Sequence, residues 1–273
     1  MHTFRGYYFR HQNENQTLAL IVGKSTDSAF IQVVTEEGSK LYPFATADFT
    51  DCIRVGDNQF SKDGIHLALP GLSGDIRYQH LTPLRSDIMG IFRFFPMQCR
   101  HTVVSMRHVL NGTVWLDGKP LCFDGGSGYV EGDSGRSFPR EYLWIAAHDL
   151  PNGDAFFLSV AEIPFCGFRF SGVICVWMLH GKEYRFATYL GAKAQITDRR
   201  VEITQHAFRV EAEILHVGAA HPLAAPQNGR MTAAVRESNC AQVALKLYQH
   251  ETLIASATSR RAGFERRTGS QVR

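Results

Sequence analysis

FRVEAEI, at residues 208–214, alternates apolar and polar side chains from its first residue to its last. The apolar positions are Phe208, Val210, Ala212 and Ile214, and the polar positions are Arg209, Glu211 and Glu213. Because successive side chains of a β-strand point to opposite faces, this alternation predicts a strand with one face in a core and the other in water. The stretch GIHLAL, at 64–69, has the same pattern.

Similar alternating stretches recur along the chain, separated by turn sequences such as EEGS, LNGT, LDGK, PNGD and LHGK. Asn-Gly and His-Gly pairs supply the positive φ angles that tight hairpins need. Only LRSDIMGIFRFFPM (84–97) and ESNCAQVALKLYQHE (237–251) could hold a helix, and both are ambiguous. We therefore predict an all-β protein, with helix in under about a fifth of its residues against an average of roughly one third.

The chain also carries signs of an internal duplication. GSKLYPFAT begins at Gly38 and GKEYRFAT at Gly181, and each has a turn glycine followed by Tyr-x-Phe-Ala-Thr. Each is preceded by an apolar stretch, AFIQVV in the first half and GVICVWML in the second. Further upstream, YYFRH and TLALIVG correspond in order to YLWIAAH and AFFLSVAEI. This shared order predicts two similar β units that join near residues 130–140.

Each unit is long enough for about eight antiparallel strands, and closing such a sheet removes its exposed edges. We therefore predict two β-barrels in tandem, with domains at residues 1–130 and 131–273. An eight-stranded barrel is wide enough to hold one small apolar ligand. By analogy with such barrels, the architecture favours a lipid or terpenoid ligand.

The composition argues against several classes of protein. The chain has 273 residues, enough for two domains, and its net charge of +3 is too small to indicate a nucleic-acid partner. The six cysteines form no C-x-x-C pair and show no zinc-finger spacing. The N-terminal stretch MHTFRGYYFRHQNENQ lacks the apolar core of a signal peptide, so we expect a cytoplasmic protein with six free thiols. No apolar run approaches the ~18 residues of a membrane-spanning helix.

The stretch GGSGYVEGDSGRSFPREYLWI, at 125–145, resembles the signature of the tocopherol cyclase family. The resemblance covers nearly the whole chain, because further segments look like family segments in the family order. These segments are GYYFRHQ, CRHTVVSMRHVLNG, GKEYRFATYLGAK, LAAPQNGRM and AGFE. One departure is Ser134, which stands where the family usually has tryptophan.

The resemblance implies two lipocalin-like antiparallel β-barrels, in agreement with the duplication. It also implies a chemistry, because plant tocopherol cyclases protonate a prenyl double bond of a prenylated hydroquinone and the phenol oxygen captures the cation. Distantly related carotenoid hydratases use similar acid chemistry with water as the nucleophile. The resemblance thus implies an intramolecular lyase or isomerase without metal or other cofactor. Its partner would be an apolar small molecule such as a prenylquinol, a terpenoid or a lipid.

Protonating an alkene requires a carboxyl group that stays protonated in a dry site. Glu131 and Asp133 are two residues apart, so on a strand they share a face, with Cα atoms about 6–7 Å apart. Two like charges at this distance raise one pKa. Glu131 is our first choice as the acid, because it follows Tyr129 as in the Tyr-x-Asp arrangement of the hydratase relatives. We also place Asp133, Tyr129 and His108 in the catalytic set, with His108 tuning the acid or activating the nucleophile.

A developing cation is stabilised by aromatic faces. We expect Tyr142 and Trp144 to bind the ligand, with weaker contributions from His148 and Arg136. For Asp133 and Arg136 an alternative is a salt-bridged corner between the two barrels.

Two functions other than catalysis remain open. The protein could bind a lipid or terpenoid without reacting it, or it could be a scaffold with a vestigial cavity. The segment IMGIFRFFPM, at 88–97, has too many large apolar side chains for an ordinary loop. We expect it near a barrel mouth, as a lid or a transient membrane contact, or else buried against the other barrel.

Overall fold

The computed structural model describes residues 3–165 and 167–269. These residues form 22 β-strands and three short 3-10 helices, and no α-helix occurs among them. The all-β prediction is therefore confirmed. Of the two ambiguous segments, 84–97 contains the 3-10 helix η1 (Gly90–Phe94), whereas 237–251 lies mainly in a long strand. No helix in the described part of the chain is long and apolar enough to cross a membrane.

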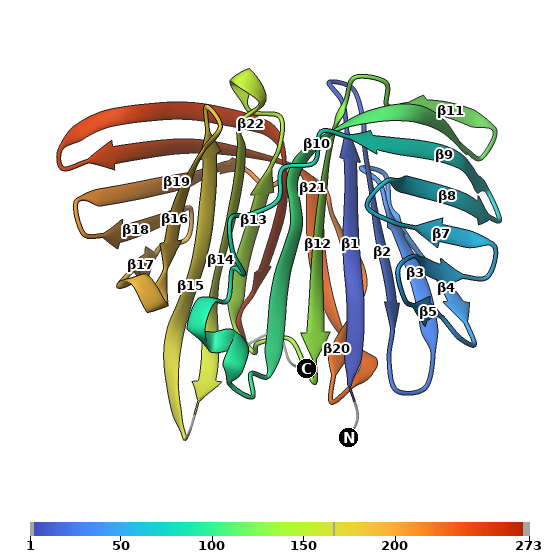
Figure 1. Ribbon diagram of the computed structural model, residues 1–273, viewed down its shortest axis with the longest axis horizontal. Helices are drawn as coiled ribbons and strands as arrows, with labels where there is room; N and C mark the ends of the chain where they lie inside the picture. Colours follow the sequence, from blue (N-terminus) through green and yellow to red (C-terminus); the bar gives the residue numbers. More distant parts are fainter. Residues whose placement is uncertain (1–2, 166, 270–273) are drawn as a thin grey trace.

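The first sheet has twelve antiparallel strands (Figure 1). They are β1 (Phe4–Gln12), β2 (Thr17–Lys24), β3 (Ala29–Val34), β4 (Ser39–Phe44), β5 (Asp48–Phe49), β6 (Ile53–Val55), β7 (Asn58–Phe60), β8 (Gly64–Leu69), β9 (Leu72–Gln79), β10 (Cys99–Leu116), β11 (Lys119–Cys122) and β12 (Ser127–Gly135). Their spatial order is β4-β3-β2-β1-β12-β10-β9-β8-β7-β6-β5, with β11 paired to β10.

The second sheet has ten antiparallel strands. They are β13 (Tyr142–Ala147), β14 (Ala155–Phe165), β15 (Phe168–Leu179), β16 (Lys182–Ala187), β17 (Lys193–Ile196), β18 (Arg200–Gln205), β19 (Phe208–His216), β20 (Ala220–Gln227), β21 (Arg230–Gln249) and β22 (Thr252–Arg267). The 3-10 helices η2 (Pro151–Gly153) and η3 (Thr188–Leu190) lie between its strands. The spatial order is β16-β15-β14-β13-β22-β21-β19-β18-β17, with β20 paired to β21.

The two sheets repeat one topology. In each sheet, the first four strands of that half of the chain lie side by side in order from the middle of the sheet to one edge. The first of these strands pairs, in the middle, with the last strand of the same half. The two Tyr-x-Phe-Ala-Thr repeats begin in the edge strands β4 and β16, which occupy equivalent places. The duplication expected from the sequence is therefore confirmed, and the protein consists of two tandem lipocalin-like barrels.

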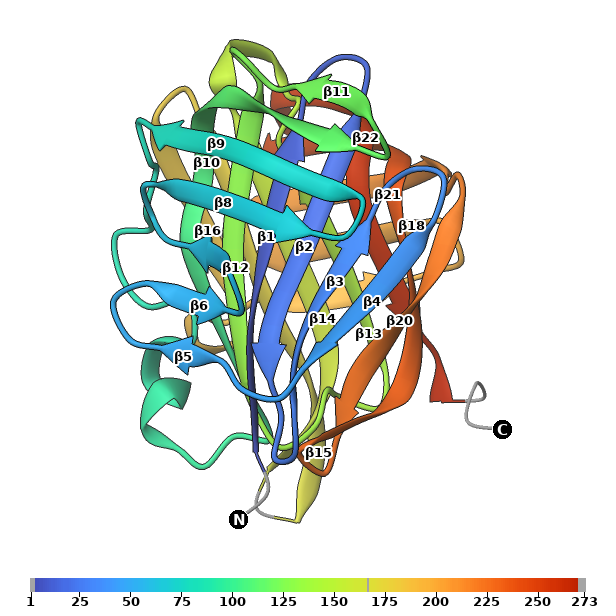
Figure 2. The same ribbon diagram turned by 90° about the vertical axis from the view of Figure 1, so that its right-hand side faces the viewer.

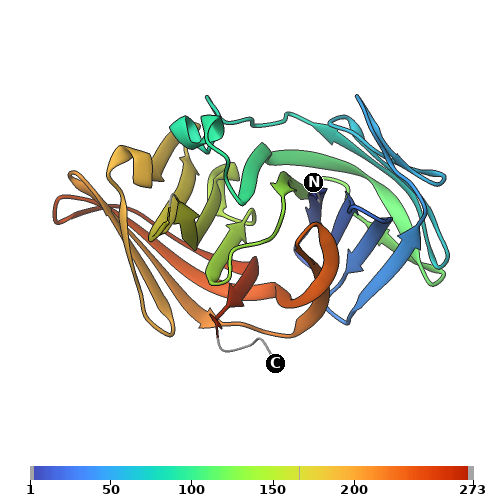
Figure 3. The same ribbon diagram turned by 90° about the horizontal axis from the view of Figure 1, so that it is seen from below.

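Each barrel interior is filled by its own hydrophobic core, and a third core combines residues of both barrels between them. Figure 3 shows the two barrels side by side, seen from below. The strands in the middle of the molecule are therefore buried on both faces. On β1, Phe9 points into the first barrel while Tyr8 packs between the barrels. On β13, Ile145 points into the second barrel while Trp144 packs between the barrels. This double burial explains why YLWIAA is apolar throughout rather than alternating with polar residues.

The change from the first sheet to the second comes after Gly135 and before Tyr142. The boundary expected between residues 130 and 131 falls inside β12, which pairs with β1 and β10 along its whole length. The segment between the sheets is tied to the β20–β21 turn, because Phe138 N–H donates to the carbonyl of Pro226 and Asn228 N–H donates to Ser137 Oγ.

The β20–β21 hairpin belongs to the second sheet but extends over the first barrel, where β20 lies beside β4 (Figure 2). The buried side chain of Gln32 on β3 makes two hydrogen bonds to Ala224 of β20. Its Nε2 donates to the carbonyl oxygen at 3.0 Å, and its Oε1 accepts from the N–H at 2.8 Å. Ser39 Oγ also donates to the carbonyl of Pro222. The hairpin therefore joins the barrels by polar contacts as well as by the third core.

The structure describes five of the six cysteines, and all five are free thiols. They are Cys52, Cys99, Cys122, Cys175 and Cys240. Cys166 lies outside the described residues, so the expectation of six free thiols stays a prediction for that position.

Candidate functional site

An apolar cavity of about 190 Å³ lies between the two sheets. We had expected a ligand space inside a barrel, but this cavity lies outside both barrel cores. Its wall combines side chains from β1, β10, β12, β13, β15, β21 and β22 with residues around η1. Most of the wall is apolar, and the ionisable exceptions are Tyr7, Tyr8, Cys99, His101, Glu131, Asp133, Tyr142, Tyr189, Glu237 and Glu265.

Glu131 reaches this cavity because of the alternation along β12. Tyr129, Glu131 and Asp133 point to the space between the barrels, whereas Val130 points into the first barrel core. Gly132 has no side chain, and the ring of Tyr7 occupies this space, since a Cβ there would lie 2.8 Å from the ring. The face shared by Glu131 and Asp133 is thus the one that the sequence predicts.

The carboxyl group of Glu131 accepts both of its hydrogen bonds on one oxygen. Tyr129 donates its hydroxyl to Oε2 at 2.5 Å, and Trp144 donates its indole N–H to the same atom at 3.1 Å. Among the described residues no hydrogen bond reaches Oε1. When the group is neutral, Oε1 is therefore the oxygen that is free to carry the proton.

Burial raises the pKa of Glu131 to about 7, and the nearby Asp133 adds to this rise. His101 and the hydrogen bonds from Tyr129 and Trp144 act in the opposite direction, because they favour the charged carboxylate. Glu131 thus changes its charge close to neutral pH. It is a carboxylic acid that can deliver a proton under ordinary conditions.

His101 on β10 completes this end of the cavity. Its Nδ1 lies 3.1 Å from Asp133 Oδ1, and its Nε2 lies 3.4 Å from Glu131 Oε2 without making a hydrogen bond. Its ring stacks on Phe157 with centroids 4.9 Å apart. Burial disfavours the charged imidazolium, but Asp133 and Glu131 outweigh this and raise the pKa of His101 to about 9. No pattern in the sequence singles out this histidine.

His101, Glu131 and Asp133 offer donor atoms that all lie within 4.8 Å of one another, which is close enough to hold a metal ion. A protonated imidazole cannot ligate a metal, however, and a neutral carboxyl group is a poor ligand. To hold a metal ion, His101 and Glu131 would have to lose their protons, and their raised pKa values make that loss less favourable. The expectation of a site without metal or other cofactor stays a prediction.

Two further acids, Glu237 on β21 and Glu265 on β22, face Glu131 from the second barrel and are directly opposite each other in the strand register. Burial raises the pKa of Glu237 to about 7 and that of Glu265 to about 8, and Glu131 contributes to both rises. Tyr8 donates its hydroxyl to Glu237 Oε1 at 2.6 Å, and Tyr142 donates its hydroxyl to Glu265 Oε1. The cavity therefore contains three carboxyl groups with raised pKa values.

The register shows how Glu265 could have been found from the sequence. Tyr8 is opposite Glu131 in the first barrel, and Trp144 is opposite Glu265 in the second. Since β1 corresponds to β13 and β12 to β22, the two glutamates occupy equivalent positions. In the sequence, GYVE and AGFE both end in glutamate, which is the one residue that they share at the same position. Glu237 gave no such signal, because its segment was ambiguous between helix and strand.

Of the other residues predicted for the site, Asp133, Tyr142 and Trp144 line the cavity and Tyr129 lies behind it. His108 and His148 are buried but are not among the lining residues. The ring of His108 packs at a tilt against that of Tyr78, and burial lowers the pKa of His108 to about 3. His148 stacks on Tyr129 with ring centroids 4.2 Å apart, and its pKa is also lowered by burial.

Arg136 is exposed and does not line the cavity either. Its backbone N–H donates to the carbonyl of Gln98, and its own carbonyl accepts from Gly229 N–H. The ion-pair partner of Asp133 is His101 rather than Arg136. The salt-bridged corner that we considered for Asp133 and Arg136 is therefore not formed.

No protein-family model and no curated protein matches the sequence, but solved structures match the fold. A "putative AttH" from Nitrosomonas europaea has a TM-score of 0.56 at 10% identity, over 98% of this chain and 92% of that chain. CghA with Sch210972 gives 0.59 at 11% identity, over 98% and 89%. Kievitone hydratase from Nectria haematococca gives 0.53 at 9% identity, over 98% and 90%.

This chain has their fold. At such low identities the likeness extends to the fold alone, and both barrels take part in it because nearly the whole chain is covered. None of the three proteins is described as a tocopherol cyclase. That part of the resemblance seen in the sequence therefore stays a proposal.

Proposed function

We propose that this protein binds a small apolar molecule between its two barrels and protonates a carbon–carbon double bond of that molecule. The observation that carries the proposal is the geometry at Glu131, which lies in an apolar wall with its free Oε1 and a pKa raised to about 7. A carboxyl group with these properties is a general acid. The specific reaction that we favour is the cyclisation of a prenylquinol, as in the tocopherol cyclases that the sequence resembles.

The reaction balances without a co-reactant. The O–H bond at Glu131 Oε1 breaks, and the alkene π electrons form a new C–H bond, which leaves a tertiary carbocation and a glutamate. The phenol oxygen of the same molecule then forms a C–O bond to the cation. Its proton passes to the ionised carboxylate of Glu237 and from there back to Glu131, which restores both groups, so the net change is an isomerisation. If water attacks instead, the net change is a hydration.

Other residues of the cavity suit this chemistry. Trp144 and Tyr8 contact each other edge to face at 5.5 Å and line the cavity, so their rings can stabilise a developing cation. Glu237 has a pKa of about 7, which allows it to accept the proton of the attacking hydroxyl when it is ionised. In this proposal, one cavity contains both the acid and the base. We propose that Glu131 acts as the acid and Glu237 as the base.

The test is incubation with prenylated hydroquinones of different chain length, with product analysis by mass spectrometry. We expect Glu131→Gln to abolish turnover while ligand affinity changes by less than about 1 kcal/mol, because the amide keeps the shape and most hydrogen bonds of the acid but cannot deliver the proton. A matched control is Glu213→Gln on the exposed face of β19, which should leave turnover unchanged.

The second candidate function is binding without reaction, favoured by the predominantly apolar wall of the cavity. Native extraction of the purified protein, followed by mass spectrometry, identifies any lipid or terpenoid that it carries. A bound ligand that survives unchanged in both the original protein and Glu131→Gln would contradict catalysis and support a lipid-binding or terpenoid-binding protein.

A further inference from the structure

Two neighbouring segments at one end of the molecule expose large apolar side chains. On and next to η1, Phe94 is 74% exposed and Ile91 is 58% exposed. At the start of β15, Phe168 is 79% exposed. We call Ile91, Phe94, Phe95 and Phe168 the aromatic end. In Figure 1 the tips of β14 and β15 reach furthest down, with η1 beside them.

The aromatic end is held in place by a second set of rings beneath it. Phe165 packs edge to face against Phe92 and Phe95, with ring centroids 6.1 and 5.4 Å apart. Phe170 stacks on Phe92 at 5.7 Å. These contacts fasten η1 to the β14–β15 hairpin, so the outward rings project from a packed base. A cluster of exposed apolar side chains on such a base is typical of an interaction site.

The base of the aromatic end is also part of the cavity wall. Met89 and Phe92 line the cavity from the η1 side, and Phe170 lines it from β15. An apolar surface therefore continues from the exposed rings to the space in front of Glu131. A ligand that entered here would stay in contact with apolar side chains along its path.

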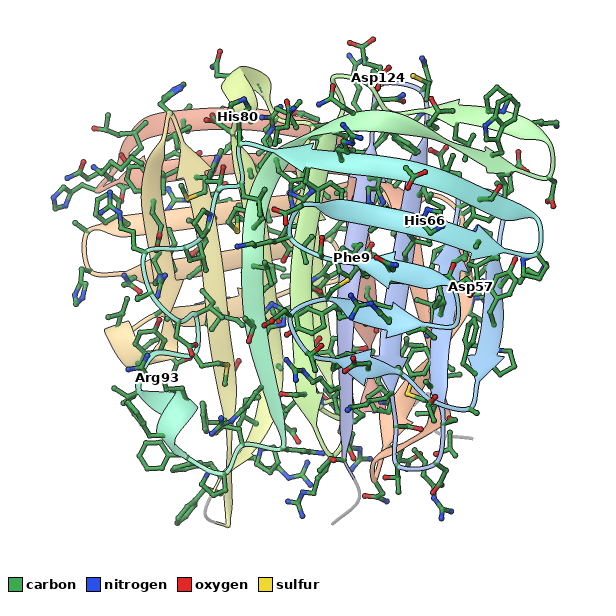
Figure 4. The ribbon with its side chains drawn as sticks, turned by 45° about the vertical axis from the view of Figure 1, so that its right-hand side comes forward. Phe9, Asp57, His66, His80, Arg93 and Asp124 are labelled. Carbon is green, nitrogen blue, oxygen red and sulfur yellow. The ribbon has the colours of Figure 1, made fainter. Side chains whose placement is uncertain are left out.

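Two arginines, Arg93 and Arg100, lie beside these exposed rings. The guanidinium of Arg93 lies over the ring of Phe94, 4.5 Å from its centroid, and Figure 4 shows Arg93 on η1 at the edge of the molecule. Arg100 donates to the carbonyls of Arg93 and Phe95. Neither arginine has a carboxylate partner among the described residues. A groove of about 440 Å³, which also contacts Phe170, is lined by Arg169, Arg266 and Arg267 together with Glu141 and Glu162, and Glu162 is the ion-pair partner of Arg169.

We propose that the aromatic end docks this protein on an anionic lipid surface, from which the apolar ligand enters the cavity. Protruding rings on turns can insert between lipid chains, while the arginines at their base meet the headgroups. A second copy of the chain is a less suitable partner. The projecting tips are convex, and two such ends would bring their arginines together.

The test is co-sedimentation of the full chain with vesicles. We compare pure phosphatidylcholine with equal parts of phosphatidylcholine and phosphatidylglycerol, at low and high salt. The original protein should bind the anionic vesicles more strongly, and salt should weaken this binding. Phe94→Ser combined with Phe168→Ser should lower the bound fraction by roughly tenfold or more, because the inserted apolar area is lost. Arg93→Gln should reduce the preference for anionic vesicles.

A matched control removes two exposed apolar side chains elsewhere. Trp115→Ser combined with Leu253→Ser changes the β10–β11 and β21–β22 hairpins, away from η1 (Figure 1). Equal loss of binding in this control would overturn the proposal, as would undiminished binding of the Phe94/Phe168 variant or no vesicle binding by the original protein. So would a dimer in sedimentation velocity that the Phe94/Phe168 variant converts to monomer. Glu131→Gln should bind vesicles normally, which separates docking from the proposed reaction.

Discussion

Trp144 and Tyr129 both favour the ionised form of Glu131, because each donates a hydrogen bond to its Oε2. The raised pKa of this carboxyl therefore results from burial, which more than offsets two favourable donors. This balance makes the acid sensitive to single substitutions around it. The direction in which the pKa of Glu131 changes when a neighbour is replaced is therefore known for each neighbour.

Replacing Trp144 by phenylalanine keeps an aromatic ring in the wall but removes the N–H donor. The pKa of Glu131 should then rise, by up to about one unit. Turnover requires the protonated acid, so its rate should fall above about pH 7 in the original protein and at a higher pH in the variant. The measurement is the pH dependence of kcat/KM with a prenylated hydroquinone. A shift to lower pH would contradict this account of the site.

Glu265 links the same cavity to the pH dependence of stability. Its folded-state pKa of about 8 lies above the ordinary value of 4.5, so folding favours the neutral acid. The contribution of neutral Glu265 to the free energy of unfolding is fully present below about pH 4.5 and is lost as the pH rises to about 8. We expect Glu265→Gln to flatten the decline in the free energy of unfolding between these limits, by a few kcal/mol at most. Urea unfolding at several pH values measures this, and a steeper decline would refute it.

At the level of single elements, the hairpin of β20 and β21 depends on polar contacts that cross between the barrels. Gln32 satisfies both the N–H and the carbonyl of Ala224. Replacement by leucine keeps the bulk but leaves these backbone groups without their partner. We expect the free energy of unfolding to fall by about 1–3 kcal/mol. The control Gln59→Leu, at an exposed position of β7, should change it far less. Equal values for the two variants in chemical denaturation would disprove this role for Gln32.

The sequence predicted β12 well and β21 poorly, for physical reasons. In GYVEGD the alternation is intact, so the shared face of Glu131 and Asp133 follows directly. The segment that contains Glu237 combines Ala, Gln, Leu and Lys, which favour helix, and only its pairing with β19 and β22 makes it a strand. Partners such as His101 depend on strand register, which local patterns do not specify.

For the whole molecule, the sequence indicated the number of barrels but not where the ligand space lies. Tyr8 and Trp144 each form part of an apolar stretch, and no local pattern tells which of their faces meets the other barrel. The third core exists only once both barrels are folded. This core, rather than the interior of either barrel, surrounds the candidate site.

The third core also predicts how the chain unfolds. If the second barrel unfolded alone, the inter-barrel faces of β1 and β12 would be exposed. If the first barrel unfolded alone, those of β13 and β14 would be exposed. We therefore expect one thermal transition, with equal calorimetric and van't Hoff enthalpies. Two separate transitions in differential scanning calorimetry would show that the barrels are stable independently.

The equivalence of Glu131 and Glu265 has a stereochemical consequence. Two identical barrels related by a twofold axis would present the same groups at both ends of the space between them. In the tandem chain, the residue opposite Glu131 on β10 is Val103, whereas the residue opposite Glu265 on β21 is Glu237. The two ends therefore differ, and a ligand has a defined head and tail between them. In an asymmetric cavity the attacking hydroxyl reaches the planar carbocation from one face only, so the stereocentre at the new C–O bond should have a single configuration and the product should be a single enantiomer.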